Sequence, residues 1–190
     1  MNFPSYVHCD AGSIFATDAA DFRNVWFGIT VRNDPDILQY IVDKHNEFVT
    51  SWKEATGDNT SSLYTILQPL PKVIFDRGVE KGGNMLGMDR QATEKGNCIL
   101  HEVLLVFSGS ELEPEGRRRL VAYREAVKAQ SIKTGTDIPF EYINYADKTQ
   151  DPLNSYGKEN VDFLRKVAAR YDPDGTLRTR MPGGFKIPMP

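Results

Sequence analysis

The segment of residues 142–147 (YINYAD) carries two tyrosines and an asparagine whose side chains could bind a small molecule or move a proton. Its composition predicts a strand over 140–145, on which Tyr142 and Asn144 point to one face and Tyr145 lies at the strand's end. A tyrosine serves as a general acid or base when a neighbour lowers its high pKa. From spacing alone, the simpler interpretation is strand packing, with the hydroxyls at the sheet edge and Asn144 in a turn.

The strongest predicted strand, residues 98–107 (CILHEVLLVF), has two adjacent polar side chains at its centre, His101 and Glu102. Neighbouring residues on a strand point to opposite faces, so these two side chains do not form a direct acid–base pair. A lone histidine in an apolar strand is more often structural, and His101 becomes a catalytic candidate only where its face lines a cavity. Glu102 is a candidate substrate contact.

A glycine-rich stretch at residues 82–87 (GGNMLG) is a third candidate, with Asn84 as its polar side chain. Glycines allow a ligand to approach the backbone closely. The lysine and Ser/Thr that complete a phosphate-binding loop are absent, and a bulged or kinked strand is the simpler interpretation. The sequence contains no Gly-x-Ser-x-Gly, no Cys–His nucleophile signature and no dinucleotide fingerprint.

The elements that would position these residues alternate between strand and helix. Strands are predicted at 25–31, 63–68, 98–107 and 140–145, and helices at 35–55, 111–131 and 158–171. The first helix has Asp34 as its cap and Pro35 at its first position, and the turn that starts at Thr56 ends it. Its expected apolar stripe is Ile37, Ile41, His45, Phe48 and Trp52. This succession of strands and helices is the ferredoxin-like βαββαβ order, an α+β fold with an antiparallel sheet, helices packed on one face, and an extra C-terminal helix and tail. Residues 1–21 are expected to form an irregular arm, and residues 22–190 a single domain.

Both faces of the predicted sheet are apolar, and this feature bears on function. The strand at 98–107 has apolar residues on both faces, and the first strand sets Trp26, Gly28 and Thr30 opposite four apolar residues. A sheet covered on one face alone would alternate apolar and polar residues. Helices supply one cover, and the other must be a ligand cavity, a second subunit or a missing domain. Trp26 is therefore a candidate substrate contact.

Composition argues against several classes of protein. The 190 residues carry a net charge of −3, and lysines and arginines are scattered, which argues against a nucleic-acid partner. No apolar run approaches the roughly 20 residues of a membrane span, and no secretory signal is apparent, so we expect a cytoplasmic protein without a membrane partner. The two cysteines and three histidines show no metal-binding spacing, and we expect no metal.

Residues 142–187 contain four motifs in series, namely Tyr-x-Asn-Tyr-x-Asp, SYG followed by EN, YDP-x-G and PGGFK. This segment resembles the C-terminal berberine-like part of fungal FAD-linked oxidases of the berberine bridge enzyme type. The upstream pieces FGITVRNDPDILQYIVDKHNEFV, LQPLPKVI and KGGNMLGMD resemble the family's preceding segments in the same order, so the resemblance covers residues 22–187.

The resemblance implies that the sheet covers a substrate held over a flavin, with Tyr142, Asn144 and Tyr145 on the flavin-facing side. In several relatives, the tyrosine that matches Tyr145 is the base that deprotonates a substrate hydroxyl. We expect this chain to lack the flavin-binding domain, so that it binds no cofactor alone and uses FAD only if a separate flavin domain is supplied. The exposed sheet face would then pair with a second copy in a homodimer.

Three functions remain open. The first is a flavin-independent enzyme of secondary metabolism, which carries out isomerisation, dehydration or cyclisation by proton transfer in a cavity on the sheet face. The second is a substrate-binding fragment of a split or truncated FAD-dependent oxidoreductase, and the third is a non-catalytic ligand-binding protein. For the first, the catalytic candidates are Tyr145, Tyr142 and His101, and the candidate substrate contacts are Asn144, Trp26, Asn84 and Glu102.

Overall fold

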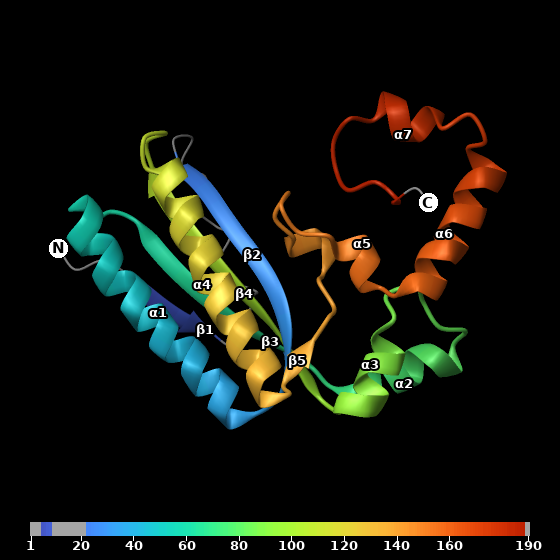
Figure 1. The fold of residues 1–190 in the computed structure, drawn as a ribbon, viewed down its shortest axis with the longest axis horizontal. Coiled ribbons are helices and arrows are strands. Elements are labelled where there is room, and N and C mark those ends of the chain that lie inside the picture. Colours follow the sequence, from blue (N-terminus) through green and yellow to red (C-terminus); the bar gives the residue numbers. More distant parts are fainter. Residues whose placement is uncertain (1–4, 9–21, 189–190) are drawn as a thin grey trace.

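The structure, a computed structural model, describes residues 5–8 and 22–188 of the chain. It contains one sheet with the strand order β1-β3-β4-β2-β5 (Figure 1). Strands β2 to β5 pair antiparallel, and β1 adds to one edge parallel to β3. The strands are β1 (Ser5–His8), β2 (Phe22–Arg32), β3 (Ser62–Leu70), β4 (Cys98–Ser108) and β5 (Asp137–Ile138).

Two long helices, α1 (Pro35–Thr56) and α4 (Glu113–Thr134), cover one face of this sheet (Figure 1). The Asp34 carboxylate accepts hydrogen bonds from two first-turn N–H groups of α1, and Gly57 ends the helix in the left-handed conformation. The predicted apolar stripe of α1 is buried against the sheet, which confirms its three- and four-residue spacing. Its members are Ile37, Ile41, His45, Phe48 and Trp52.

The strand order confirms the ferredoxin-like α+β fold. Helix α1 connects β2 to β3 and α4 connects β4 to β5, and both helices lie on the same face. The core between helices and sheet takes the odd-numbered side chains of β2, such as Phe27 and Ile29. Because side chains alternate along a strand, Trp26, Gly28 and Thr30 belong to the other face, which we call the second face.

The strand predicted at residues 140–145 is wrong. The last strand is β5, which is only two residues long and ends before Pro139, whereas Ile143–Tyr145 form a 3-10 turn, η1. Phe140 is buried in a second apolar cluster. The apolar spacing of this segment therefore reflects packing in that cluster rather than strand alternation.

Further helices lie beside the sheet (Figure 1). They are α2 (Lys72–Glu80), α3 (Met88–Lys95), α5 (Pro152–Ser155), α6 (Lys158–Tyr171) and α7 (Thr176–Arg180). Four of them contribute a residue to the second apolar cluster: Phe75, Met88, Leu153 and Leu164. Helix α6 has the predicted bounds. No helix was predicted from the sequence at the positions of the other four, which are short and bury at most two residues each.

The irregular arm predicted for residues 1–21 is wrong at Ser5–His8, which form β1. This strand takes its place by backbone pairing, with Ser5 in register with Leu63 and His8 with Ile66. Residues 1–4 and 9–21 of the predicted arm lie outside the described residues.

Candidate functional site

The second face carries a buried carboxyl group, Glu102, at the centre of β4, where it is 1% exposed. Gly28 on β2 and Ile66 on β3 flank it in register. Neither carboxyl oxygen of Glu102 has a hydrogen-bond partner within the described part of the chain. Burial raises the pKa of Glu102 to about 7, because desolvation penalises the charged form. A carboxyl group in this state can take or give a proton near neutral pH.

The tyrosine segment lies over Gly28, next to Glu102. A Cβ added at Gly28 would lie 3.5 Å from the carbonyl oxygen of Tyr145 and 3.7 Å from its Cβ, so the absent side chain leaves room for this segment. The Tyr145 ring packs edge-on against the rings of Trp26 and Tyr142, with centroids 5.4 Å and 5.1 Å away. The structure thus brings Trp26, Tyr145 and Glu102 together, and Tyr142 lies at the edge of this group.

Tyr145 is not activated as a base. Burial, the negative charge of Glu102 and the neighbouring Tyr142 all raise the pKa of Tyr145 above its ordinary value. A phenol with a raised pKa stays protonated near neutral pH, so it can donate a hydrogen bond but is a poor base. The role of base that the resemblance implied for Tyr145 is therefore better suited to Glu102.

Two polar residues border this set. Asn144 is exposed, and its Nδ2 donates a hydrogen bond to the Tyr142 hydroxyl at 2.8 Å, so it orients that ring. Thr30 lies on the second face and is buried, and its Oγ1 has no partner among the described residues. Sequence analysis gave Thr30 no role, although its position two residues from Gly28 on the same strand already placed it on this face.

A polar turn after the tyrosines fixes their segment to the sheet. The side-chain amide of Gln150 accepts a hydrogen bond from the Gly28 N–H and donates one to the Gly28 carbonyl oxygen. Asp147 forms an ion pair with Arg117 of α4. Gln150 was not among the candidates predicted from the sequence, because a glutamine in a polar stretch gives no signal that it will be buried.

His101 lies on the face opposite Glu102, between the sheet and the helices. Its Nε2 lies 3.2 Å from the Tyr123 hydroxyl, and its Nδ1 lies 3.4 Å from the carbonyl oxygen of Ile66. Burial lowers the pKa of His101 to about 4, so the ring is neutral near neutral pH. Strand alternation directs this side chain into the helix-covered core, and the structure therefore removes His101 from the catalytic candidates.

Asn84 is exposed and lies in the loop between α2 and α3. Its Oδ1 accepts a hydrogen bond from the backbone N–H of Leu86 at 2.9 Å, which closes a local turn. Gly82, Gly83 and Gly87 have positive φ, so this stretch is a loop and the predicted kinked strand is wrong. This hydrogen bond gives Asn84 a local structural role, and its role as a substrate contact stays a prediction.

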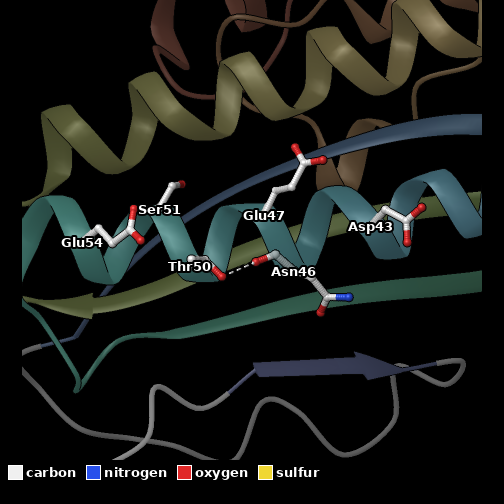
Figure 2. Close-up of a pocket in the computed structure, with 6 residues that line it drawn as sticks. All are labelled: Asp43, Asn46, Glu47, Thr50, Ser51 and Glu54. Carbon is white, nitrogen blue, oxygen red and sulfur yellow. Dashed lines mark hydrogen bonds between the residues drawn. The ribbon is translucent and has the colours of Figure 1, made fainter.

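A shallow hollow of about 500 Å³ lies on the outer surface of α1 (Figure 2). Its lining residues recur at three- and four-residue spacing, so they form one polar face of the helix: Asp43, Asn46, Glu47, Thr50, Ser51 and Glu54. Glu47 is paired with Lys44 and Ser51 accepts a hydrogen bond from Arg119, as expected of a solvated helix face. A second hollow lies beside His101 in the helix-covered core and has no room for a water molecule. The predicted cavity on the second face and the predicted homodimer stay predictions.

Other classes of site receive little support. No helix within residues 22–188 combines the length and the apolar character needed to cross a bilayer. The described residues hold no group of three or more His, Cys, Asp or Glu side chains suited to a metal ion. Burial raises the pKa of the Cys98 thiol to about 11, so this cysteine is a poor nucleophile, and Cys9 lies outside the described residues.

Comparisons with known proteins identify relatives named for flavin chemistry. The chain is 28% identical to the FAD-dependent monooxygenase drtC of Aspergillus calidoustus over 190 residues, which cover 98% of this chain and 36% of the relative. It is 33% identical to sdcF of Emericella nidulans over 166 residues, covering 87% and 34% of the two chains. It is also 33% identical to FUP4 of Fusarium proliferatum over 177 residues, covering 90% and 33%. Both are likewise named FAD-dependent monooxygenases.

The chain thus spans about a third of the length of the curated relatives it matches. No family model matches the chain, and no solved structure matches it. The similarity supports a relationship to FAD-linked oxidoreductases. The finer berberine-like assignment stays a prediction.

Proposed function

We propose that this chain binds a small organic molecule against the second face of its sheet and moves a proton to or from it. Glu102 is the acid–base group, and the Tyr145 hydroxyl is the hydrogen-bond donor beside it. The observation that carries this proposal is the buried Glu102 carboxyl, which has a pKa of about 7 and no partner among the described residues. An unpaired buried polar group costs about 1–3 kcal/mol, and a ligand that supplies the missing partner would offset this cost.

The polar groups of the second face favour a ligand that presents hydroxyl groups on an aromatic or apolar frame. The ionised Glu102 carboxylate only accepts hydrogen bonds, and the Thr30 hydroxyl, which no described residue engages, can accept one more. Trp26 and Tyr145 supply ring surface for the frame. A ligand hydroxyl or acidic C–H would pass its proton to Glu102, while the Tyr145 hydroxyl donates to the oxygen that gains negative charge.

Isomerisation, dehydration and cyclisation can each begin with such a proton transfer, and Glu102 can return the proton to another atom of the same molecule. The resemblance to fungal FAD-linked oxidases supports a substrate from secondary metabolism. We therefore propose proton-transfer chemistry on a small hydroxylated metabolite as the function of this site.

The second face does not fit FAD. The charged group at its centre is the Glu102 carboxyl, whereas a diphosphate is bound by backbone N–H groups, arginine or lysine.

A second candidate function follows from the comparisons, because the relatives are named FAD-dependent monooxygenases and are about three times as long as the matched segment. In this candidate, the same face binds the substrate of a flavin-dependent oxidoreductase whose flavin is held by another polypeptide segment. Titration of the chain with free FAD, followed by the fluorescence anisotropy of the flavin, tests whether this chain alone binds it, and we expect no change.

The binding of β-naphthol tests the proton-transfer site, because this fluorescent phenol is neutral near pH 7 and emits at a different wavelength once it has lost its proton. We expect about tenfold tighter binding when Glu102 is ionised, since a charge-assisted hydrogen bond is stronger than a neutral one. The bound, excited phenol should then transfer its proton to Glu102 and show naphtholate emission. Glu102→Gln should remove both the pH dependence and this emission.

Glu94→Gln is the matched control, because Glu94 is an exposed glutamate on α3. It should behave as the wild type in both measurements. Binding without pH dependence, or equal naphtholate emission from the wild type and Glu102→Gln, would exclude Glu102 as the proton acceptor. Binding that survives without any proton transfer would favour a non-catalytic ligand-binding protein.

A further inference from the structure

The edge of β2 that faces away from β4 is completed by two different parts of the chain. The Arg32 N–H donates to the carbonyl oxygen of Thr136 at 2.7 Å, and Thr30 pairs with Ile138 in β5. Strand β5 ends there, so within the described ranges no strand lies beside the next backbone N–H and C=O groups on this edge, those of Gly28.

The side-chain amide of Gln150 takes the place of the missing strand at Gly28. Its Nε2 donates to the Gly28 carbonyl oxygen at 2.7 Å, and its Oε1 accepts from the Gly28 N–H at 3.3 Å. A primary amide carries one acceptor and donors on the same planar group, as a backbone peptide does, so it continues the hydrogen-bond ladder by one step. Gln150 is buried, and its exposed fraction is 7%.

The same amide also holds the turn that follows the tyrosines. Gln150 Oε1 accepts a second hydrogen bond from the Asp147 N–H at 3.1 Å, and the Gln150 N–H donates to the Asp147 carbonyl oxygen at 2.8 Å. Asp147 is joined to Arg117 of α4 and follows Tyr145 by two residues. One side chain therefore links the edge of β2 to the turn that carries Tyr145.

We propose that Gln150 is a positioning residue that holds Tyr145 over Gly28 and beside Glu102. The proposal rests on the proposed function, because the value of this placement lies in the pairing of Tyr145 with Glu102. Alanine removes both hydrogen bonds to Gly28. An ionised glutamate keeps the shape but loses the donor and sets a negative charge against the Gly28 carbonyl oxygen, whereas a protonated glutamate restores one donor and one acceptor.

The indole N–H resonance of Trp26 in a nitrogen–proton NMR spectrum reports the position of Tyr145, because the Tyr145 ring lies edge-on to Trp26 at 5.4 Å. Trp52, in the helix-covered core, is the internal control, and Trp26→Phe assigns the two signals. Tyr145→Ala defines the Trp26 shift without a tyrosine ring. Gln150→Ala should reproduce at least about half of that displacement and leave the Trp52 resonance unchanged.

Gln150→Glu gives the decisive comparison and keeps the test valid if Gln150→Ala fails to fold. At acid pH its Trp26 resonance should match that of the unsubstituted protein, and as the pH rises it should move toward the Tyr145→Ala position. The other ionisable groups near this turn are Glu102, Asp147, Arg117 and Tyr145, so the same titration of the protein with Gln150 supplies the baseline.

A Trp26 resonance that stays in place in Gln150→Ala, or that shows no extra titration in Gln150→Glu, would overturn the positioning role. Equal movement of the Trp26 and Trp52 resonances would also overturn it, because it would indicate general loss of structure. The measurement needs no ligand. Failure of the proton-transfer proposal, seen with Glu102→Gln and β-naphthol, is thus distinguishable from failure of this one.

Discussion

Replacement of Glu102 by glutamine is expected to stabilise the folded protein by roughly 3 kcal/mol at about pH 8, and by less than about 1 kcal/mol at about pH 5. The pKa of this carboxyl rises from its ordinary value of 4.5 to about 7 in the folded state because of burial. At low pH the group is protonated in both states. As the pH rises through this window, the unfolded state loses its proton first and the free energy of unfolding falls, and glutamine removes that loss. Urea unfolding at the two pH values measures the difference.

Glu94→Gln, on the exposed surface of α3, serves again as the matched control and should change stability little at either pH. A Glu102→Gln variant that is equally stable or less stable than the wild type at the higher pH would show that the folded protein accommodates the charge. The carboxylate would then be stabilised by other groups, and the proposed site would lose its acid–base group.

Gly87→Ala is expected to lower the free energy of unfolding by about 3 kcal/mol or more. Gly87 has a φ of 73°, and a Cβ there would clash with the carbonyl oxygen of Tyr156, so the substitution adds a clash with backbone to an unfavourable conformation. This contact joins the start of α3 to the segment before α6. Urea unfolding of the variant measures the loss.

Gly57→Ala separates the two causes. Gly57 has a similar backbone conformation, with a φ of 66°, and nothing lies within 4 Å of an added Cβ. This control should cost only about 1 kcal/mol, the penalty of the left-handed region alone. Equal losses for the two substitutions would contradict the close approach of Gly87 to Tyr156.

Local signals in the sequence predicted the sheet and its helical cover. The Asp34-Pro35 start of α1 and its apolar stripe at Ile37, Ile41 and Phe48 are buried as spacing predicts, because amphipathic periodicity is set by the nearest layer of the core. The strand at residues 98–107 is apolar on both faces, and both faces are buried: Leu100 and Leu104 on the second face, and Val103 and Leu105 on the helix side. The expected cover of the second face was a ligand cavity, a second subunit or a missing domain, whereas these side chains are already buried in the single chain.

The predictions that failed concern features that depend on packing between segments far apart in the sequence. The segment at residues 140–145 has the composition of a strand, yet the chain leaves β5 at Pro139 because Phe140 packs into the second cluster. In the sequence, His101 was a catalytic candidate and Glu102 only a candidate substrate contact. Their roles separate only when the helices are placed, since α1 and α4 cover the face of His101 and leave Glu102 on the other. The amide of Gln150 completes a sheet edge that no local pattern indicates.

The pKa of the Glu102 carboxyl is the most direct test of the proposed function. Carbon-13 NMR of the side-chain carboxyl groups, with Glu102→Gln used to assign the resonance, follows its ionisation in the unliganded protein. We predict a midpoint of about 7, against an ordinary value of 4.5. A midpoint near the ordinary value would show that this carboxyl is a solvated or paired anion, and would contradict its assignment as the proton-transfer group of the second face.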